Sequence, residues 1–255
     1  EGQPDLIISA VPVSAFAGVV EGLIERNFNG VFIDVASIKN DFHQTIANDF
    51  KMSWEIYTKD QKPKMALFVS KYDHCLFDIL GRYSADELNV EIPLIISNHE
   101  DLKPIADRFS IPFHFVPFTK EIKEKGEQQQ LDLLAKHQID FVVLARYMQI
   151  ITPSLITAYK NKIINIHPAL LPKYGGKGMY GDKVHQAVIA AGEKESGITI
   201  HYVDELYDHG NIIFQAKCTI EEKDTPEMLA QKIHLLEHQH YPEVIENLLQ
   251  MQNSR

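Results

Sequence analysis

The sequence has little of what several large protein classes require. Its 255 residues include only two cysteines, Cys75 and Cys218, which are too few for a disulfide framework and lack a CxxC spacing. This scarcity fits a reducing compartment, and the first residues lack the cationic and apolar regions of a signal peptide, so we expect a cytoplasmic protein. No apolar run approaches the roughly 20 residues that span a bilayer, and we expect no membrane association.

Positive charge is also scarce. The 25 Lys and Arg residues face 35 Asp and Glu residues, which leaves a net charge of -10. Binding to a nucleic acid requires clustered cations that displace counterions from the phosphates, so we expect no nucleic-acid partner. With 45% hydrophobic and 24% charged residues the chain is globular in composition, and its length suffices for one large α/β domain and a smaller unit.

Strand and helix patterns divide the chain into a short first block and a longer remainder. The first block has strand patterns at 5–11 and 31–35 and helix patterns at 14–26 and 41–50. The polar segment 58–64 is a candidate linker. We therefore predict a small α/β unit at residues 1–60 and a larger domain at residues 64–255.

The larger domain shows apolar strand patterns that alternate with helical patterns. Such alternation is typical of a doubly wound, mostly parallel sheet, because helices cover both of its faces. The turn Asp208-His209-Gly210 predicts an antiparallel hairpin near the end of the domain. The predicted strands lie at 65–69, 90–97, 113–116, 141–144, 162–166, 197–203 and 212–220. A first predicted helix ends near residue 80, and four more lie at 100–109, 120–137, 184–191 and 225–249.

One strand pattern ends in residues that can carry chemistry. In the segment IINIHPALLP, at 163–172, Asn165 and His167 precede Pro168, which interrupts the hydrogen bonding of a strand. Both side chains are therefore expected at the carboxyl end of a strand, where open α/β sheets bind ligands. Taken alone, this spacing also fits ordinary turn chemistry.

A second polar group, DELYDHG at 204–210, lies between the last two strand patterns. Taken alone, it fits a solvated turn. Combined with the first motif, it supplies the groups that acyl transfer needs. The Asn165 amide can bind a developing oxyanion, the His167 imidazole can move a proton, and the Asp208 carboxylate can orient the imidazole or a water. This set requires no Ser or Cys nucleophile.

Residues 165–210 resemble the folate-dependent formyltransferases and hydrolases. The segments NIHPALLPKY and YDHG are most similar to glycinamide ribonucleotide formyltransferases, and this likeness continues to about residue 255. Asn165, His167 and Asp208 fall on that family's Asn, His and Asp. The resemblance implies catalytic roles for these three residues and a formyltransferase-like fold.

Residues from about 42 to 165 instead resemble formyltetrahydrofolate deformylases, the hydrolytic relatives. The segments VSKYDHCL, at 69–76, and LARYMQI, at 144–150, carry this resemblance. At the first segment the transferases have a Gly-Asn-Gly-Ser-Asn loop whose backbone N–H groups can bind a substrate phosphate, and this chain has no such loop. The resemblance also places the folate pterin beside two segments, which predicts contacts from Met148, Gln149, Ile151, Val203 and Asp204.

The first block contains the segments PDLIISAVPV, at 4–13, and FIDVASIK, at 32–39. With these segments, residues 1–40 resemble a fragment of a prephenate dehydrogenase dinucleotide domain, which raises the hypothesis of a mosaic chain. The segment lacks the GxGxxG turn that holds a pyrophosphate, so we expect no dinucleotide there. We expect no tightly bound cofactor at all. By the family resemblance, 10-formyltetrahydrofolate is the substrate and the only expected small-molecule partner. The sequence leaves open whether the protein forms a homo-oligomer.

Several histidines could bind a metal by residue type alone. They are His74 beside Cys75, His99, and the group His234, His238 and His240. The helix that carries this last group lacks the Glu of an HExxH motif, so we expect surface or packing roles and no metal. The glycine-rich run 175–178 lacks the spacing of a Walker motif, and a mobile loop over the site is the preferred interpretation.

Three functions follow from these patterns. The first is hydrolysis of 10-formyltetrahydrofolate to formate and tetrahydrofolate. The second is transfer of the formyl group to glycinamide ribonucleotide in purine biosynthesis, at the same site. The third is a non-catalytic chimeric scaffold, in which the parts fold together but the sites do not match.

Overall fold

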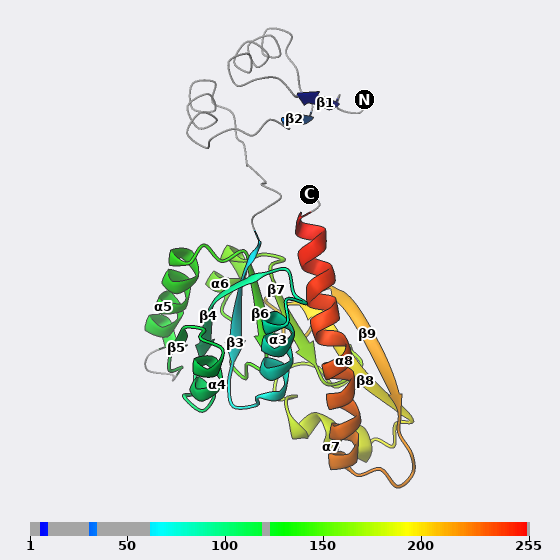
Figure 1. Ribbon diagram of the computed structural model, residues 1–255. Helices are drawn as coiled ribbons and strands as arrows, with labels where there is room; N and C mark the ends of the chain where they lie inside the picture. Colours follow the sequence, from blue (N-terminus) through cyan, green and yellow to red (C-terminus); the bar gives the residue numbers. More distant parts are fainter. Residues whose placement is uncertain (1–5, 10–30, 35–61, 119–122, 254–255) are drawn as a thin grey trace. The chain divides into compact units, whose positions relative to one another are not determined.

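A computed structural model of the chain describes residues 6–9, 31–34, 62–118 and 123–253 (Figure 1). The chain divides into two units, Glu1–Thr58 and Lys59–Arg255. In the first unit, strands β1 (Leu6–Ser9) and β2 (Val31–Asp34) pair in parallel, so both strands predicted there are confirmed. The helices predicted at 14–26 and 41–50 lie outside the described residues, as do residues 58–61 of the predicted linker, whereas the last linker residue, Lys64, begins a strand.

The second unit is built on a seven-stranded sheet in the order β5-β4-β3-β6-β7-β8-β9. The pairs from β5 to β7 are parallel, whereas β8 runs antiparallel to both β7 and β9. The predicted mostly parallel sheet and its antiparallel hairpin are thus confirmed. The strands are β3 (Lys64–Val69), β4 (Glu91–Ser97), β5 (Phe113–Phe115), β6 (Phe141–Ala145), β7 (Ile163–His167), β8 (Glu195–Tyr202) and β9 (Ile212–Thr219).

Helices cover both faces of this sheet, which explains the continuous apolar character of its central strands. Alternate residues of β3 enter two different hydrophobic clusters, because successive side chains of a strand point to opposite faces. One cluster includes residues of α3, α4, α7 and α8, and the other includes residues of α5 and α6. The helices are α3 (His74–Ser84), α4 (Lys103–Arg108), α5 (Lys123–Lys136), α6 (Pro153–Ala158), α7 (Asp182–Ala190) and α8 (Pro226–Asn253).

The long helix α8 begins as its sequence predicts and crosses one face of the sheet beside α3 (Figure 1). The Thr225 hydroxyl oxygen accepts a hydrogen bond from the backbone N–H of Met228, 3.3 Å away, and Pro226 is the first helical residue. The helix continues four residues past its predicted end at 249, to Asn253. Tyr241 is fully buried in the middle of α8 and its hydroxyl donates to the Leu144 carbonyl of β6, so the helix is anchored to the centre of the sheet.

Two local features depart from the sequence-based expectation. Helix α6, which was not predicted, begins after Thr152, whose hydroxyl oxygen accepts a hydrogen bond from the Leu155 N–H. It spans only six residues, too few for a clear amphipathic period. Strand β7 runs one residue further than predicted and includes His167. Within the described residues, no helix has both the length and the apolar character needed to cross a membrane.

Candidate active site

The predicted catalytic residues Asn165 and His167 lie two positions apart on β7 and therefore project from the same face of the sheet. The antiparallel strand β8 places His201 directly opposite Asn165. Asn165 is half-buried, whereas His167 and His201 are almost completely buried. Pairing of β7 with β8 therefore assembles a group of three polar side chains at one end of the sheet.

Asp208 completes this group from the turn that joins β8 to β9. Its backbone is in the left-handed region, with φ of 57°, which Asp tolerates better than most residues. One carboxylate oxygen, Oδ2, lies 3.6 Å from Nδ1 of His167, and the other, Oδ1, lies 3.6 Å from Nε2 of His201. The backbone N–H of Gly176 donates to Oδ2 over 2.8 Å. The predicted trio of Asn165, His167 and Asp208 is therefore brought together, with His201 between two of its members.

Backbone carbonyls define which ring nitrogens carry protons. The Nε2–H of His167 donates to the carbonyl oxygen of Tyr174 over 2.8 Å, because a carbonyl can only accept. In neutral His167 the lone pair is therefore on Nδ1, which faces Asp208. In the same way, Nδ1–H of His201 donates to the Tyr202 carbonyl, so its Nε2 accepts from the Asn165 amide nitrogen, 3.3 Å away.

The surroundings shift the pKa values of His167 and Asp208 in the same direction. Burial lowers the pKa of the His167 imidazole, and the nearby Asp208 carboxylate and Tyr174 carbonyl offset only part of this effect. Burial alone would raise the pKa of the Asp208 carboxyl, but His201, His167 and the Gly176 N–H hold it below its usual range. The site thus combines a neutral imidazole with an ionised carboxylate at neutral pH.

The loop after β7 packs against the catalytic group. A Cβ atom added at Gly175 would lie 3.2 Å from the Asp208 Cβ and would overlap the end of the Leu171 side chain, so a larger residue there would have to displace Leu171. Together with the Gly176 hydrogen bond, this places the predicted glycine-rich loop directly beside the site. Its mobility remains a prediction.

The residues predicted to contact folate occupy two segments near this site. Ile151 and Val203 both pack against the hydrophobic cluster that includes residues of α5 and α6. The backbone N–H of Met148 donates to the Ser70 hydroxyl oxygen over 2.9 Å. Gln149 is half-buried, and Asp204 is exposed and accepts a hydrogen bond from the Leu206 N–H. Their role in ligand binding remains a prediction.

Two polar residues of this region were not predicted. His201 was missed because the register between β7 and β8, which places it opposite Asn165, cannot be read from spacing along the chain. Arg146 directly follows β6, with φ of 63° and a side chain that is almost completely buried. Its Nη1 lies 3.4 Å from Oε1 of Glu237 in α8, and its guanidinium lies 5.3 Å from the centre of the Tyr72 ring. Strained, buried positions of this kind concentrate at functional sites.

A cavity of about 330 Å³ is lined in part by the loop that follows β7. Leu171, Tyr174, Glu193, Ser196 and Gln215 are among its lining residues. It contains none of the predicted catalytic or folate-contacting residues. Gln215 is engaged within the protein, because its side-chain amide donates to the Leu171 carbonyl and to the Thr199 hydroxyl.

Comparisons with known proteins agree with this fold. Residues 63–245 match the family model described as formyl transferase. A formyltetrahydrofolate deformylase of Synechocystis is 46% identical over 187 residues, which cover 73% of this chain and 64% of that protein. The chloroplastic phosphoribosylglycinamide formyltransferase of Arabidopsis thaliana is 39% identical over 189 residues, which cover 72% of this chain and 65% of that protein. The crystal structure of a Pseudomonas syringae formyltetrahydrofolate deformylase matches with a TM-score of 0.72 at 34% identity, over 83% of this chain and 69% of that chain.

These matches also bear on the predicted mosaic. One family model runs without interruption across both of the segments that resemble different relatives, 42–165 and 165–255, from residue 63 to residue 245. The comparisons give no support to a prephenate dehydrogenase origin for residues 1–40. That resemblance rested on short β-branched strands, which many α/β units share. The chain spans about two thirds of the length of the curated relatives that it matches.

Proposed function

Because the chain belongs to the formyl transferase family, we propose that it hydrolyses 10-formyltetrahydrofolate to formate and tetrahydrofolate. One observation carries this proposal above the others. The basic nitrogen Nδ1 of His167 faces the Asp208 carboxylate, while Asn165 offers an amide N–H on the same strand. The site therefore combines a proton acceptor, a carboxylate and an amide N–H that can donate a hydrogen bond to an oxyanion, which are the groups that attack on a carbonyl requires.

The reaction begins when Nδ1 of His167 takes a proton from a water molecule as the water oxygen attacks the formyl carbon. The carbonyl oxygen becomes an oxyanion and accepts a hydrogen bond from the Asn165 amide, which has a second N–H besides the one directed at His201. The Asp208 carboxylate stabilises the imidazolium that forms. The C–N bond then breaks, His167 returns its proton to the departing nitrogen, and formate leaves with tetrahydrofolate.

The loop after β3 favours water over an amine that carries a phosphate. Residues 70–73 contain no glycine, and Asp73 occupies the N-cap position of α3 without a side-chain capping hydrogen bond. A helix N-terminus attracts anions, but a carboxylate at that position repels a dianionic phosphate. Lys71 is the one cation in this loop. The phosphate of glycinamide ribonucleotide would therefore be bound poorly. Water, rather than the amine of that substrate, is then the nucleophile that attacks the formyl carbon.

Ser70, at the start of this loop, is already engaged within the protein. Its hydroxyl donates to Oδ1 of Asn98 over 2.6 Å and accepts from the Met148 N–H. These bonds tie the carboxyl ends of β3, β4 and β6 together. Ser70 is therefore not free to bind a phosphate.

A direct experiment separates the proposed activities. The full chain is incubated with 10-formyltetrahydrofolate, with and without saturating glycinamide ribonucleotide, and both formate and formylated amine are measured. We expect formate to be released at the same yield in both reactions. Stoichiometric formylation of the amine would overturn the hydrolase proposal in favour of the transferase, and the absence of both products would support a non-catalytic scaffold.

Formyl transfer to glycinamide ribonucleotide remains the second candidate. The specific observation in its favour is the 39% identity to the Arabidopsis transferase, together with the transferase-like segment that contains Asn165 and His167. The catalytic group would serve either reaction, because only the nucleophile differs.

A further inference from the structure

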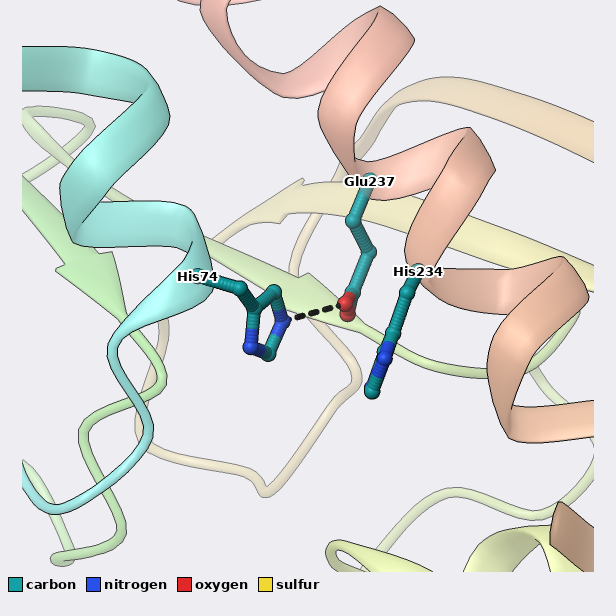
Figure 2. A group of neighbouring side chains, drawn as sticks. All are labelled: His74, His234 and Glu237. Carbon is teal, nitrogen blue, oxygen red and sulfur yellow. Dashed lines mark hydrogen bonds and ion pairs between the residues drawn. The ribbon is translucent and has the colours of Figure 1, made fainter. Parts of the chain in front are cut away.

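Outside the catalytic group, the structure brings together two histidines and a glutamate from distant parts of the sequence (Figure 2). His74 is the first residue of α3, and His234 and Glu237 lie three positions apart on α8, on neighbouring positions of one helix face. Nε2 of His74 lies 2.7 Å from Oε2 of Glu237. One ligand atom from each of the three residues lies within 4.8 Å of the other two.

The two imidazoles of this group are stacked rather than paired by hydrogen bonds. The ring centres of His74 and His234 lie 4.4 Å apart, with the planes inclined by 32°. Within the described part of the chain, His234 makes no hydrogen bond, so its ring nitrogens are available to a ligand.

Glu237 supplies the negative charge of the group. Its side chain is fully buried, and burial alone would raise its pKa, but His74 and Arg146 hold the pKa below its usual range. Arg146 is the only full cation in contact with it among the described residues, at 3.4 Å, which is a long distance for an ion pair between buried groups. The carboxylate is therefore ionised and only partly compensated.

A second observation comes from the neighbouring helix. His185, on α7, is almost completely buried, and its Nδ1 has no hydrogen-bond partner among the described residues. Helix α7 packs against α8, the helix that carries His234 and Glu237. A buried polar atom without a partner is costly, and such atoms in folded proteins call for an explanation.

We propose that His74, His234 and Glu237 bind a divalent transition metal, with Zn²⁺ as the preferred ion. Two imidazoles and one carboxylate form a recognised three-ligand set for zinc, in which the fourth position stays open to water or another ligand. Histidine nitrogens favour Zn²⁺, Cu²⁺ and Ni²⁺ over Mg²⁺ and Ca²⁺, which prefer oxygen ligands. The site is independent of the proposed hydrolysis, and it departs from the sequence-based expectation of no metal.

The competing interpretation is a purely internal network that packs α3 against α8. It accounts for the bond between His74 and Glu237. It does not account for His234, which adds a second imidazole without forming a hydrogen bond, or for the unpartnered Nδ1 of His185. A metal would give the His234 ring a partner, because the cation would use its nitrogen lone pair.

Metal binding by the full chain tests this proposal. The protein, without a histidine tag and stripped of metal with a chelator, is titrated with Zn²⁺ by calorimetry, and its thermal unfolding is followed with and without the ion. We expect one equivalent to bind and to raise the melting temperature, since a ligand of the folded state stabilises it. His234→Gln and Glu237→Gln should each weaken binding by at least about tenfold.

Two variants on the same helix serve as controls. His240→Gln and Glu243→Gln remove the same chemical groups outside the metal group, and both should bind Zn²⁺ as the parent does. His234→Gln should fold normally because its ring has no hydrogen bond to lose. If Glu237→Gln fails to fold, Zn²⁺ binding by His234→Gln still decides the test. Failure of the parent to bind one equivalent, or unchanged binding by His234→Gln, would overturn the proposal.

Discussion

The Nε2–H of His167 donates to the carbonyl oxygen of Tyr174 over 2.8 Å, and this bond determines how the ring can act. With Nε2 engaged, proton exchange must occur at Nδ1, which points toward Asp208. Tyr174 itself has φ of 58°, so a left-handed backbone position in the loop presents this carbonyl. The loop therefore selects the tautomer of the His167 imidazole.

Removal of either proton-handling group should abolish most of the activity. We expect His167→Ala and Asp208→Asn each to lower the turnover of 10-formyltetrahydrofolate by at least about a hundredfold. Circular dichroism and thermal unfolding should remain close to those of the parent. Near-normal turnover in either variant would show that the assigned roles are wrong.

His201 should act as a positioning residue through Asn165. His201→Leu removes the acceptor that orients the Asn165 amide, and we expect kcat to fall by about tenfold while KM changes little, because the amide acts on the transition state. His201→Gln keeps an acceptor and should recover part of the loss. Equal losses in the two variants would contradict a role through this hydrogen bond.

The pH profile should report the lowered pKa of His167. Only the neutral ring can accept a proton, so kcat/KM falls as the pH drops through this pKa. Because burial lowers it from the ordinary 6.5, the midpoint of the acid limb should lie below 6.5. In Asp208→Asn the carboxylate that raises this pKa is gone, while Arg146 and His201, which lower it, remain, so the midpoint should move further down. An upward shift in that variant would refute the assignment.

Two glycines provide a matched test of the turn that carries Asp208. A Cβ at Gly210 would overlap the carbonyl of Tyr202, so Gly210→Ala must displace backbone and should lower the free energy of unfolding by about 1–3 kcal/mol. Gly81 lies in α3 with no atom within 4 Å of an added Cβ, and Gly81→Ala should stabilise the protein by about 0.5–1 kcal/mol. Urea unfolding curves measure both. The same sign for both substitutions would contradict the close approach at Gly210.

The order of strands and helices could be predicted because the central strands of the large sheet are distinct apolar runs. β6 illustrates this, since all five of its residues are buried between two helical layers. Helix α6 could not be predicted, because its six residues are positioned by the Thr152 cap and by packing rather than by a long period.

The candidate site was predictable only where chemistry coincided with a local motif. Asn165 and His167 end an apolar segment and Asp208 lies in a recognisable turn, so all three could be named. His201 is an ordinary member of a strand until the register with β7 is known. The contact between His74 and Glu237 joins residues 163 positions apart, and no spacing rule along the chain connects them.

The groups proposed to break the C–N bond all lie after residue 162, on β7, β8 and the turn that follows, whereas the loop with Asp73 that we propose disfavours a phosphate follows β3. Bond cleavage and acceptor choice are thus encoded in separate stretches of the gene. Exchange of one short loop could redirect the formyl group from water to an amine while the chemical machinery stays untouched. Under this proposal, the two activities named among the relatives of this chain differ in one short loop, and a loop graft at residues 70–73 is the direct test.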